Sequence, residues 1–275
     1  MNRVQKRHAP MTGDPQRNHP LFRAIRQIVK PGNIVMEIGA GLGILSFEAA
    51  KAHAKWIYAI ECDPRSSSVG KKETKNRGLQ NKICWLEDFS YNVALLEKVD
   101  VLIQETVGSM AFDENFLSAL QDAKKRLLKP NGKIIPAKIA LWGAPVTGVR
   151  QKTGTWKVRA VKPEQFLSEP KEILSVTTKT FSKTKIKINS SWIANKKSKC
   201  TGVALWSKIT WGPGLVTDAS PLAPPTHWKQ AHLACAPQSV QPRQRLHFSI
   251  QIAPDREDPW VKTIVEWRLK TKSNF

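Results

Sequence analysis

The sequence has little of what marks membrane, secreted or zinc-binding proteins. No stretch approaches the roughly 20 consecutive apolar residues of a membrane-spanning helix. The basic residues near the N-terminus are not followed by an apolar run, so we expect no signal peptide. The four cysteines are scattered without a C-x-x-C pair, which argues against a disulfide framework or a zinc site. We therefore expect a cytoplasmic protein without a metal centre and without membrane contact.

Acidic residues are also scarce, because 22 of them stand against 44 lysines and arginines, giving a net charge of +22. The imbalance is greatest after residue 136, where 23 basic residues accompany 8 acidic ones, compared with 21 and 14 before it. Such a surface is typical of proteins that bind polyanions, so nucleic acid is a candidate partner of the C-terminal half. A solvated basic face explains the composition equally well, because the lysines between Lys179 and Lys187 are scattered singly.

The most informative stretch is a glycine-rich turn. The apolar residues 34–38 predict a strand, Gly39, Gly41 and Gly43 follow it, and residues 44–52 are typical of a helix. Glycines at such a turn let the backbone approach a ligand where a Cβ atom would clash. The pattern therefore predicts a nucleotide-type cofactor site, with an ordinary tight turn as the alternative.

Residues around this turn indicate which cofactor it holds. Glu37 lies two residues before the first glycine, and Ile44 stands where dinucleotide sites place their third glycine. This spacing favours S-adenosylmethionine (SAM) over NAD. Glu61 ends the next predicted strand, where a carboxylate can accept hydrogen bonds from both ribose hydroxyls. Glu87 and Asp88 follow the third strand, where a carboxylate commonly faces the adenine.

Strands and helices alternate through the first half of the chain. Predicted strands cover 34–38, 56–60, 83–86, 100–104 and 133–135, and predicted helices cover 21–29, 44–52, 66–77 and 115–128. Residues 129–132 predict a turn, and residues 1–10 predict a poorly ordered segment. The alternation indicates an α/β fold with a doubly wound, Rossmann-like sheet and helices on both faces.

The pattern changes at Pro136. Short alternating segments rich in Thr, Val, Ile and Trp follow, at 185–188, 202–206, 246–250 and 263–267. These segments are typical of an all-β domain, so we place a domain boundary near residue 136.

Two glutamates follow the fourth predicted strand, at the edge where ligands of such sheets bind. Glu105 and Glu114 are nine residues apart with Gly108 between them, which suits a loop that turns back on itself. Such a hairpin could aim both carboxylates at one guanidinium, whose paired donors match carboxylate geometry. The two charges would also leave one guanidino nitrogen more nucleophilic. On spacing alone, two solvated loop glutamates are the more common outcome.

Five motifs in the same order resemble those of the protein arginine N-methyltransferase family, in a compact, prokaryote-like form. They are the glycine turn (35–46), the strand end 60–62, the glutamate pair in 105–114, the passage 128–136 and the Thr-His-Trp stretch in 225–230. His8, Met11, Asp14 and Arg17 fall on the family's spacing in the helix that covers SAM. The resemblance implies an N-terminal segment with this helix (1–30), a SAM-binding Rossmann-like domain (31–136) and a β-barrel-like substrate domain (137–275).

The resemblance also implies the chemistry, an SN2 transfer of methyl from SAM to a guanidino nitrogen of a protein or a small molecule. Glu105 and Glu114 would grip the guanidinium, and Arg17 would pair with the methionine carboxylate of SAM. His227 would hold its loop, paired with Asp14, and could help to carry a proton away, with a purely structural histidine as the alternative. The substrate pocket would be lined by Met11, Phe116 and Trp228, of which Trp228 would act by packing.

The sequence departs from the family pattern at several points. Residues 1–10 contain no counterpart of the family's Tyr-Phe helix, and Thr106 stands where the family usually has Trp. The helical dimerisation arm is missing or shortened between Leu141 and Lys162, which leaves dimerisation open. A chain of net charge +22 would repel Arg-rich peptides at long range. A small guanidine, or one arginine in a non-basic partner, is therefore the better-fitting acceptor.

Two other functions remain as alternatives. The basic C-terminal half suggests a methyltransferase of RNA or of a ribosomal component, although the Asn-Pro-Pro-Tyr type of motif used on base amines is absent. The third hypothesis is a SAM-binding module that has lost catalysis, which the retained Glu105 and Glu114 oppose.

Overall fold

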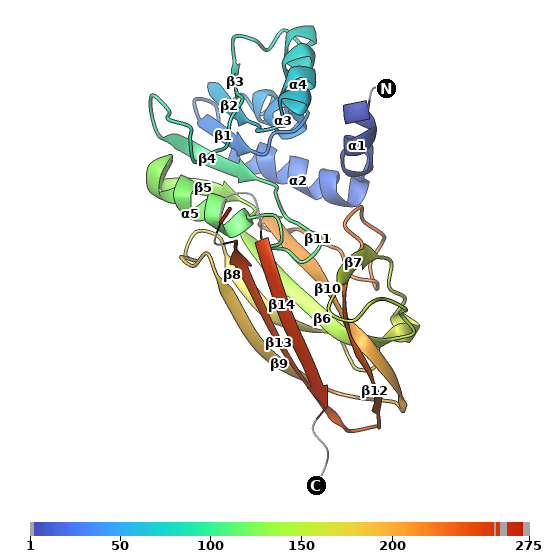
Figure 1. Ribbon diagram of the computed structural model, residues 1–275. Helices are drawn as coiled ribbons and strands as arrows, with labels where there is room; N and C mark the ends of the chain where they lie inside the picture. The colour runs from blue at the N-terminus through green and yellow to red at the C-terminus, as the bar shows by residue number, and fades with distance from the viewer. Residues whose placement is uncertain (1–2, 256, 259–262, 272–275) are drawn as a thin grey trace.

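The computed structural model describes residues 3–255, 257–258 and 263–271. A parallel sheet with its helices forms one end of the molecule, and long antiparallel strands form the other (Figure 1). The helices are α1 (Arg3–Thr12), α2 (Pro15–Ile28), α3 (Ile44–Lys51), α4 (Pro64–Asn76), α5 (Phe116–Arg126) and the short 3-10 helix η1 (Pro163–Gln165).

The strands divide into a parallel and an antiparallel group. The parallel strands are β1 (Ile34–Ile38), β2 (Trp56–Ile60), β3 (Ile83–Leu86), β4 (Val99–Gln104) and β5 (Leu128–Ile135). The antiparallel strands are β6 (Lys138–Thr147), β7 (Trp156–Arg159), β8 (Lys171–Thr177), β9 (Ile186–Ile193), β10 (Ser198–Gly212), β11 (Leu215–Asp218), β12 (Gln230–Val240), β13 (Arg245–Pro254) and β14 (Thr263–Thr271).

The parallel sheet has the order β3-β2-β1-β4-β5, with β1 at its centre. Ile38, the last residue of β1, is in register with Ile60 of β2 and Gln104 of β4. The strand order reverses between β1 and β4, and ligands of open α/β sheets bind at such a reversal, outside the carboxyl ends of the strands. The predicted α/β fold is confirmed, and the glycine turn after β1 lies beside the loop that carries Glu105.

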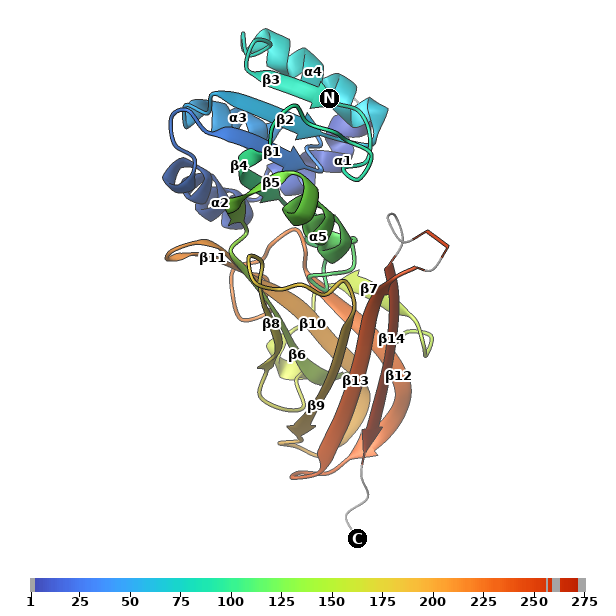
Figure 2. The same ribbon diagram turned by 90° about the vertical axis from the view of Figure 1, so that its left-hand side faces the viewer.

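The antiparallel strands form two sheets that face each other (Figure 2). One has the order β7-β12-β10-β6-β8, with β11 beside β10, and the other has the order β14-β13-β9. Side chains link their edges: Trp267 of β14 donates to the Ala234 carbonyl of β12 at 3.3 Å, and Lys171 of β8 donates to the Ser191 carbonyl of β9 at 2.5 Å. Trp192 and Phe248 pack between the sheets, with ring centroids 5.6 Å apart. The arrangement is barrel-like, as predicted.

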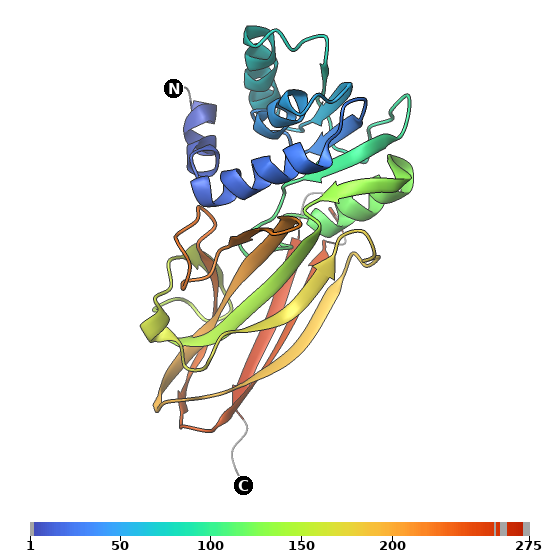
Figure 3. The same ribbon diagram turned by 180° about the vertical axis from the view of Figure 1, so that it is seen from behind.

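Helix α2 lies between the parallel sheet and the antiparallel strands (Figure 3). Its buried residues Leu21, Ala24 and Ile25 form part of the common core, and the helix contacts α3, β10 and β11. The approach is close at Gly212 of β10, where a Cβ atom would lie 3.4 Å from the Ile28 side chain. The hydrophobic faces of both parts are therefore buried against the same helix.

Three local predictions were wrong. Residues 3–10, expected to be poorly ordered, are helical, and Arg7 of α1 donates at 2.6 Å to Asp63, the N-cap of α4. The expected turn at 129–132 lies inside β5, where the chain bulges between Leu128, paired with Val99, and Lys133, paired with Val101. Pro130 is accommodated there because a bulge needs no ladder hydrogen bond from its nitrogen. Helix α2 also begins earlier than expected, at Pro15.

Two further points concern whole segments. The segment 141–162 is described throughout and contains the end of β6 and all of β7, but no helix. Within the described ranges, no helix is long and apolar enough to cross a membrane.

The contact between Gly70 and Trp85 provides a test of the packing in this part. A Cβ atom on Gly70 would lie 2.1 Å from Cη2 of Trp85, whose indole N–H donates to Thr74 at 2.9 Å. Alanine would gain about 1 kcal/mol in helix propensity, but overpacking a fixed ring costs about 1–3 kcal/mol. We expect Gly70→Ala to lower the free energy of unfolding by about 1 kcal/mol in urea titrations. Ser68→Ala, on the exposed side of α4, serves as the control, and unchanged stability of Gly70→Ala would show that the ring moves aside freely.

Candidate active site

The glycine turn packs tightly against elements from three parts of the chain. Gly39, Gly41 and Gly43 have φ of +73°, +55° and +82°, a region that disfavours side chains. A Cβ atom on Gly39 would lie 2.8 Å from Cγ2 of Thr106, and one on Gly43 would lie 2.8 Å from Trp85. Both the backbone conformation and the close packing therefore require glycine at these positions. This agrees with the predicted cofactor site at the turn.

Glu61 lies directly beside this turn. Its carboxylate accepts one hydrogen bond from the Gly41 N–H and another from the Asp63 N–H, both at 2.7 Å. The structure thus brings a predicted ribose-binding carboxylate to the glycine turn and fixes its orientation through backbone donors.

Glu37 has a different position from the other predicted cofactor residues. Its side chain is buried beneath the turn and accepts a short hydrogen bond from the Ser46 hydroxyl of α3. Burial raises the pKa of Glu37 to about 8. The contact ties β1 to α3, so Glu37 supports the turn from below and does not line a cavity.

Glu87 and Asp88 lie on opposite sides of the chain after β3. Glu87 accepts a hydrogen bond from Ser67 and forms an ion pair with Lys71 at 2.8 Å. Both partners belong to α4, so the Glu87 side chain lies against that helix. Asp88 lines the cavity next to the glycine turn and accepts from the Asn92 amide at 2.8 Å. Of the two predicted adenine-facing carboxylates, the structure therefore brings only Asp88 to the cavity.

This cavity, of about 320 Å³, opens at the carboxyl ends of β1, β2 and β4. Its lining residues are Ile38, Gly39, Ile60, Cys62, Asp88, Phe89, Ser90, Tyr91, Thr106, Asp113, Glu114, Asn115 and Ala119. Three of them are carboxylates and none is a lysine or arginine, in a chain with twice as many basic as acidic residues. A cavity of this composition suits a cation.

Glu114 projects into the cavity from the loop that follows β4. Its side chain is exposed to the cavity, but the surrounding protein still removes much of its solvent. Burial, followed by the nearby Asp113 and Glu105 charges, raises the pKa of Glu114 to about 7. A carboxyl group that ionises near neutrality is typical of functional sites.

Glu105, the other predicted substrate carboxylate, forms a buried ion pair with Arg17. The Arg17 Nε donates to Glu105 Oε2 at 3.0 Å, and Nη2 makes a shorter contact with the same oxygen. Both side chains are at most 5 % exposed. Arg17 Nη1 donates to Asn18 Oδ1 at 2.6 Å. Two residues that were predicted to hold different ligands are thus in direct contact with each other.

Asp14 connects the N-terminus of α2 to the Thr-His-Trp loop. Its Oδ1 caps α2 by accepting from the Gln16 and Arg17 N–H groups, at 2.9 and 3.2 Å. Its Oδ2 lies 2.8 Å from both the backbone N and the ring Nδ1 of His227. Burial lowers the pKa of His227 despite this carboxylate, so the imidazole is neutral at neutral pH. The predicted pairing of His227 with Asp14 is present.

Trp228 attaches the same loop to the hairpin that follows β4. Its indole N–H donates to the Val107 carbonyl at 2.5 Å, and the Ser109 hydroxyl donates to the Trp228 carbonyl at 3.0 Å. Trp228 is buried and lies beside the His227 ring. Its position fits the expected packing role, because it fixes the hairpin without lining the cavity.

The other two predicted pocket residues do not meet at the cavity. Phe116 is fully buried, with its ring centroid 6.3 Å from that of Phe112, because its face of α5 points into the core. Met11 is partly buried on α1, where its carbonyl accepts from the Asn18 amide. Asp113, which was not among the predicted site residues, lines the cavity instead. Its position directly before Glu114 is the sequence feature that could have indicated it.

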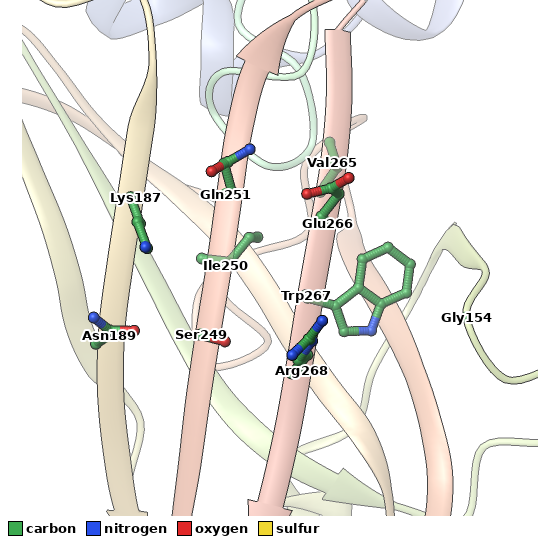
Figure 4. Close-up of a pocket in the computed structure, with 10 residues that line it drawn as sticks. All are labelled: Gly154, Lys187, Asn189, Ser249, Ile250, Gln251, Val265, Glu266, Trp267 and Arg268. Carbon is green, nitrogen blue, oxygen red and sulfur yellow. The ribbon is translucent and has the colours of Figure 1, made fainter.

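A larger cavity, of about 720 Å³, lies on the antiparallel strands (Figure 4). Its polar lining forms two rows across β9, β13 and β14: Asn189–Ser249–Arg268 and Lys187–Gln251–Glu266. The two rows contain positive and negative side chains together with amides and a hydroxyl. They therefore do not form a concentrated basic patch. The described residues contain no group of three or more His, Cys, Asp and Glu placed to hold a metal ion.

Comparison with known proteins places this geometry in context. Residues 143–272 match the family model described as the arginine methyltransferase oligomerization subdomain, and residues 12–140 match the model of ribosomal protein L11 methyltransferase (PrmA). A probable protein arginine N-methyltransferase 6.1 of Oryza sativa subsp. indica is 27% identical, over 92% of this chain and 82% of its own. These matches agree with the resemblance of the sequence motifs to the protein arginine N-methyltransferases.

A further relative and two solved structures extend the comparison. An arginine N(omega)-methyltransferase of Streptomyces achromogenes subsp. streptozoticus is 24% identical, over 82% of this chain and 70% of its own. The fold matches the Trypanosoma brucei PRMT1 enzyme–prozyme complex with AdoHcy at a TM-score of 0.85, with 20% identity over 98% of this chain and 94% of that chain. Arabidopsis thaliana protein arginine methyltransferase 10 has a TM-score of 0.82, with 18% identity over 97% of each chain.

The double role of Asp14 can be tested by two substitutions. Asp14→Ala removes the α2 cap and both contacts with His227, and loss of a cap alone costs about 1 kcal/mol. We expect a decrease of about 2 kcal/mol in the free energy of unfolding, measured in urea. Asp14→Asn keeps an oxygen for the cap and should lose less than Asp14→Ala. Equal losses would show that the cap contributes little.

Proposed function

We propose that this protein is a SAM-dependent N-methyltransferase whose acceptor is a guanidino nitrogen, in an arginine or in a small guanidine. The observation that carries the proposal is the acidic cavity beside the glycine turn. Glu114 lines this cavity and is near enough to Glu105 for that charge, after burial and Asp113, to raise the pKa of Glu114. Similarity to the rice and Streptomyces relatives supports methyl transfer to arginine, since both are named for it.

The residues at the glycine turn fit SAM. The turn leaves no room for side chains, Glu61 is held beside it by the Gly41 and Asp63 N–H groups, and Asp88 lines the cavity. Glu61 would bind the ribose diol, and Asp88 would face the adenine. Arg17 would hold the methionine carboxylate with N–H groups that its contacts to Glu105 and Asn18 leave unused. Bound SAM supplies an electrophilic methyl group on its sulfonium.

The protein's contribution to the reaction is positioning and charge. Glu105 and Glu114 would hold the guanidinium from two sides and concentrate its positive charge away from the reacting nitrogen, which becomes the better nucleophile. That nitrogen gains a methyl group and must release a proton. Glu114, with a pKa of about 7, or the neutral His227 could accept it.

Charge also limits the acceptor. A net charge of +22 repels Arg-rich peptides before they reach the cavity, whose carboxylates act only at short range. A small guanidine, or a single arginine in a non-basic protein, avoids this repulsion. The Streptomyces relative, named for arginine itself, supports the small acceptor, and the rice relative supports the protein acceptor.

A second candidate function has one specific observation in its favour. Residues 12–140 match the model of the ribosomal protein L11 methyltransferase, and the C-terminal half is strongly basic. A ribosomal acceptor, protein or RNA, would account for both. A SAM-binding module without catalysis is the third candidate, and it predicts SAM binding without transfer.

The direct test follows labelled methyl groups from SAM into a lysate separated into small molecules, protein and RNA. We expect label in protein or in a small guanidine, reduced about 100-fold or more in Glu114→Gln, because a carboxylate that acts in the transition state contributes on that order. SAM affinity should change by no more than a few-fold. Glu164→Gln on η1 is the matched surface control. Label in RNA, or in no fraction, would reject guanidino chemistry.

The raised pKa of Glu114 predicts a pH profile. The carboxyl group is neutral below about pH 7 and can hold a guanidinium only when ionised, so kcat/KM should rise as the pH increases through about 7 and then level off. Initial rates between pH 5.5 and 9 with a guanidine acceptor would show this step. The residual activity of Glu114→Gln should lack it, and a wild-type profile that is already flat from pH 5.5 upward would contradict the assignment.

A further inference from the structure

Asp113 has no role in the mechanism above, although it lines the same cavity as Glu114. Its Oδ1 accepts from the Met110 N–H at 2.8 Å, which fixes the carboxylate inside the hairpin. A Cβ atom on Gly108 would lie 2.3 Å from this oxygen, so Gly108 is what allows the carboxylate to occupy its place. Burial raises the pKa of Asp113, because the site provides little solvent for its charge.

With a guanidine of one positive charge as the acceptor, the cavity has more negative than positive charges. Arg17 and Glu105 form an ion pair and together add no net charge. When all three are ionised, Asp88, Asp113 and Glu114 bring three negative charges to a cavity whose lining includes no lysine or arginine. Bound SAM adds one net positive charge and a guanidinium a second, so one carboxylate stays unmatched. Buried carboxylates are costly without a cation, which makes a second positive charge on the acceptor favourable.

The geometry indicates which carboxylate receives that second charge. Asp88 lies after β3, on the side of the cavity assigned to the adenine, and is bonded to Asn92. Asp113 directly precedes Glu114 and is near enough to raise its pKa. A cation that belongs to the same molecule as the guanidinium can therefore reach Asp113.

We propose that Asp113 is a specificity-determining residue that selects guanidines carrying a second cationic group. The inference rests on the proposed function and narrows its substrate class to small dications, such as guanidines with a terminal amine. The competing explanation is that Asp113 only braces the hairpin through Met110. A bracing role would affect every acceptor equally, whereas a charge role separates dications from monocations.

The test compares agmatine, which carries a guanidinium and an ammonium, with pentylguanidine, in which a methyl group replaces the ammonium. The measured quantity is the ratio of the two kcat/KM values at saturating SAM and pH 8, with the full-length protein. We expect wild type to prefer agmatine by about 10-fold, the order of a single charge-assisted contact. Asp113→Asn keeps an oxygen for the Met110 N–H but loses the charge, and should bring the ratio close to one.

Two further variants make the ratio decisive. Asp113→Glu keeps the charge and should retain a preference for agmatine, and Glu164→Gln on η1 should leave the ratio unchanged. Both acceptors are measured on the same preparation, so a partial loss of folded protein cancels in the ratio. If Asp113→Asn is inactive, the same ratio is compared between Asp113→Glu and Asp113→Ser. The proposal requires a preference for agmatine in Asp113→Glu and none in Asp113→Ser.

The outcomes separate this inference from the proposed function. No preference in wild type, or an undiminished preference in Asp113→Asn, would overturn the selective role of Asp113 and leave the methyltransferase assignment standing. Methylation of arginine in proteins but of neither probe would also overturn the inference alone. Failure of every guanidino acceptor, with SAM bound normally, would reject the proposed function itself.

Discussion

One carboxylate, that of Asp14, connects the parts from which the candidate site is built. One of its oxygens caps α2, and the other holds both the backbone and the ring of His227. The cap places Arg17 in the first turn of the helix, where it reaches Glu105. The contact with His227 fixes the loop whose Trp228 binds the hairpin. A carboxylate at the N-terminus of a helix is stabilised there by the exposed N–H groups, which explains why this group can be buried.

The acidic cavity is the second constraint on the molecule. Its carboxylates lie in a chain with twice as many basic as acidic residues, and most of the excess positive charge is in the antiparallel part. At physiological ionic strength, charges more than about 8 Å away are largely screened. The local environment of a bound molecule is therefore set by the cavity, while the overall charge governs which molecules approach. The overall charge disfavours the approach of polycations and the cavity favours a bound cation, so a small acceptor with few positive charges fits best.

The reliable sequence predictions concerned features that local rules determine. The glycine turn could be recognised because a positive φ and close packing at three alternating positions leave few other residues possible. The alternation of strands and helices reflects the same hydrophobic periodicity that buries them. The pairing of His227 with Asp14 came from the family resemblance, since no local rule connects residues 213 positions apart.

The structure departs from the sequence expectations where side-chain orientation or contacts between distant residues determine the position of a residue. Glu87 and Asp88 are adjacent, and successive side chains of an extended chain point in opposite directions, so only one could face the cavity. Phe116 depends on the rotation of α5, which its packing against Phe112 determines. The helix at residues 3–10 contacts Asp63, far along the chain. None of these contacts can be inferred from a short window of sequence.

The position of α2 between the parallel sheet and the antiparallel strands has a consequence for how the protein unfolds. The helix is about 21 Å long, its core residues belong to both parts, and the Gln16 carbonyl accepts from Thr217 of β11 at 2.9 Å. Separating the two parts would expose the apolar side of α2 and break the contacts of Asp14 and Trp228 together. Denaturation should accordingly occur as one cooperative transition that spans both parts. An isolated fragment containing only residues 31–136 would lack the helix that completes its core.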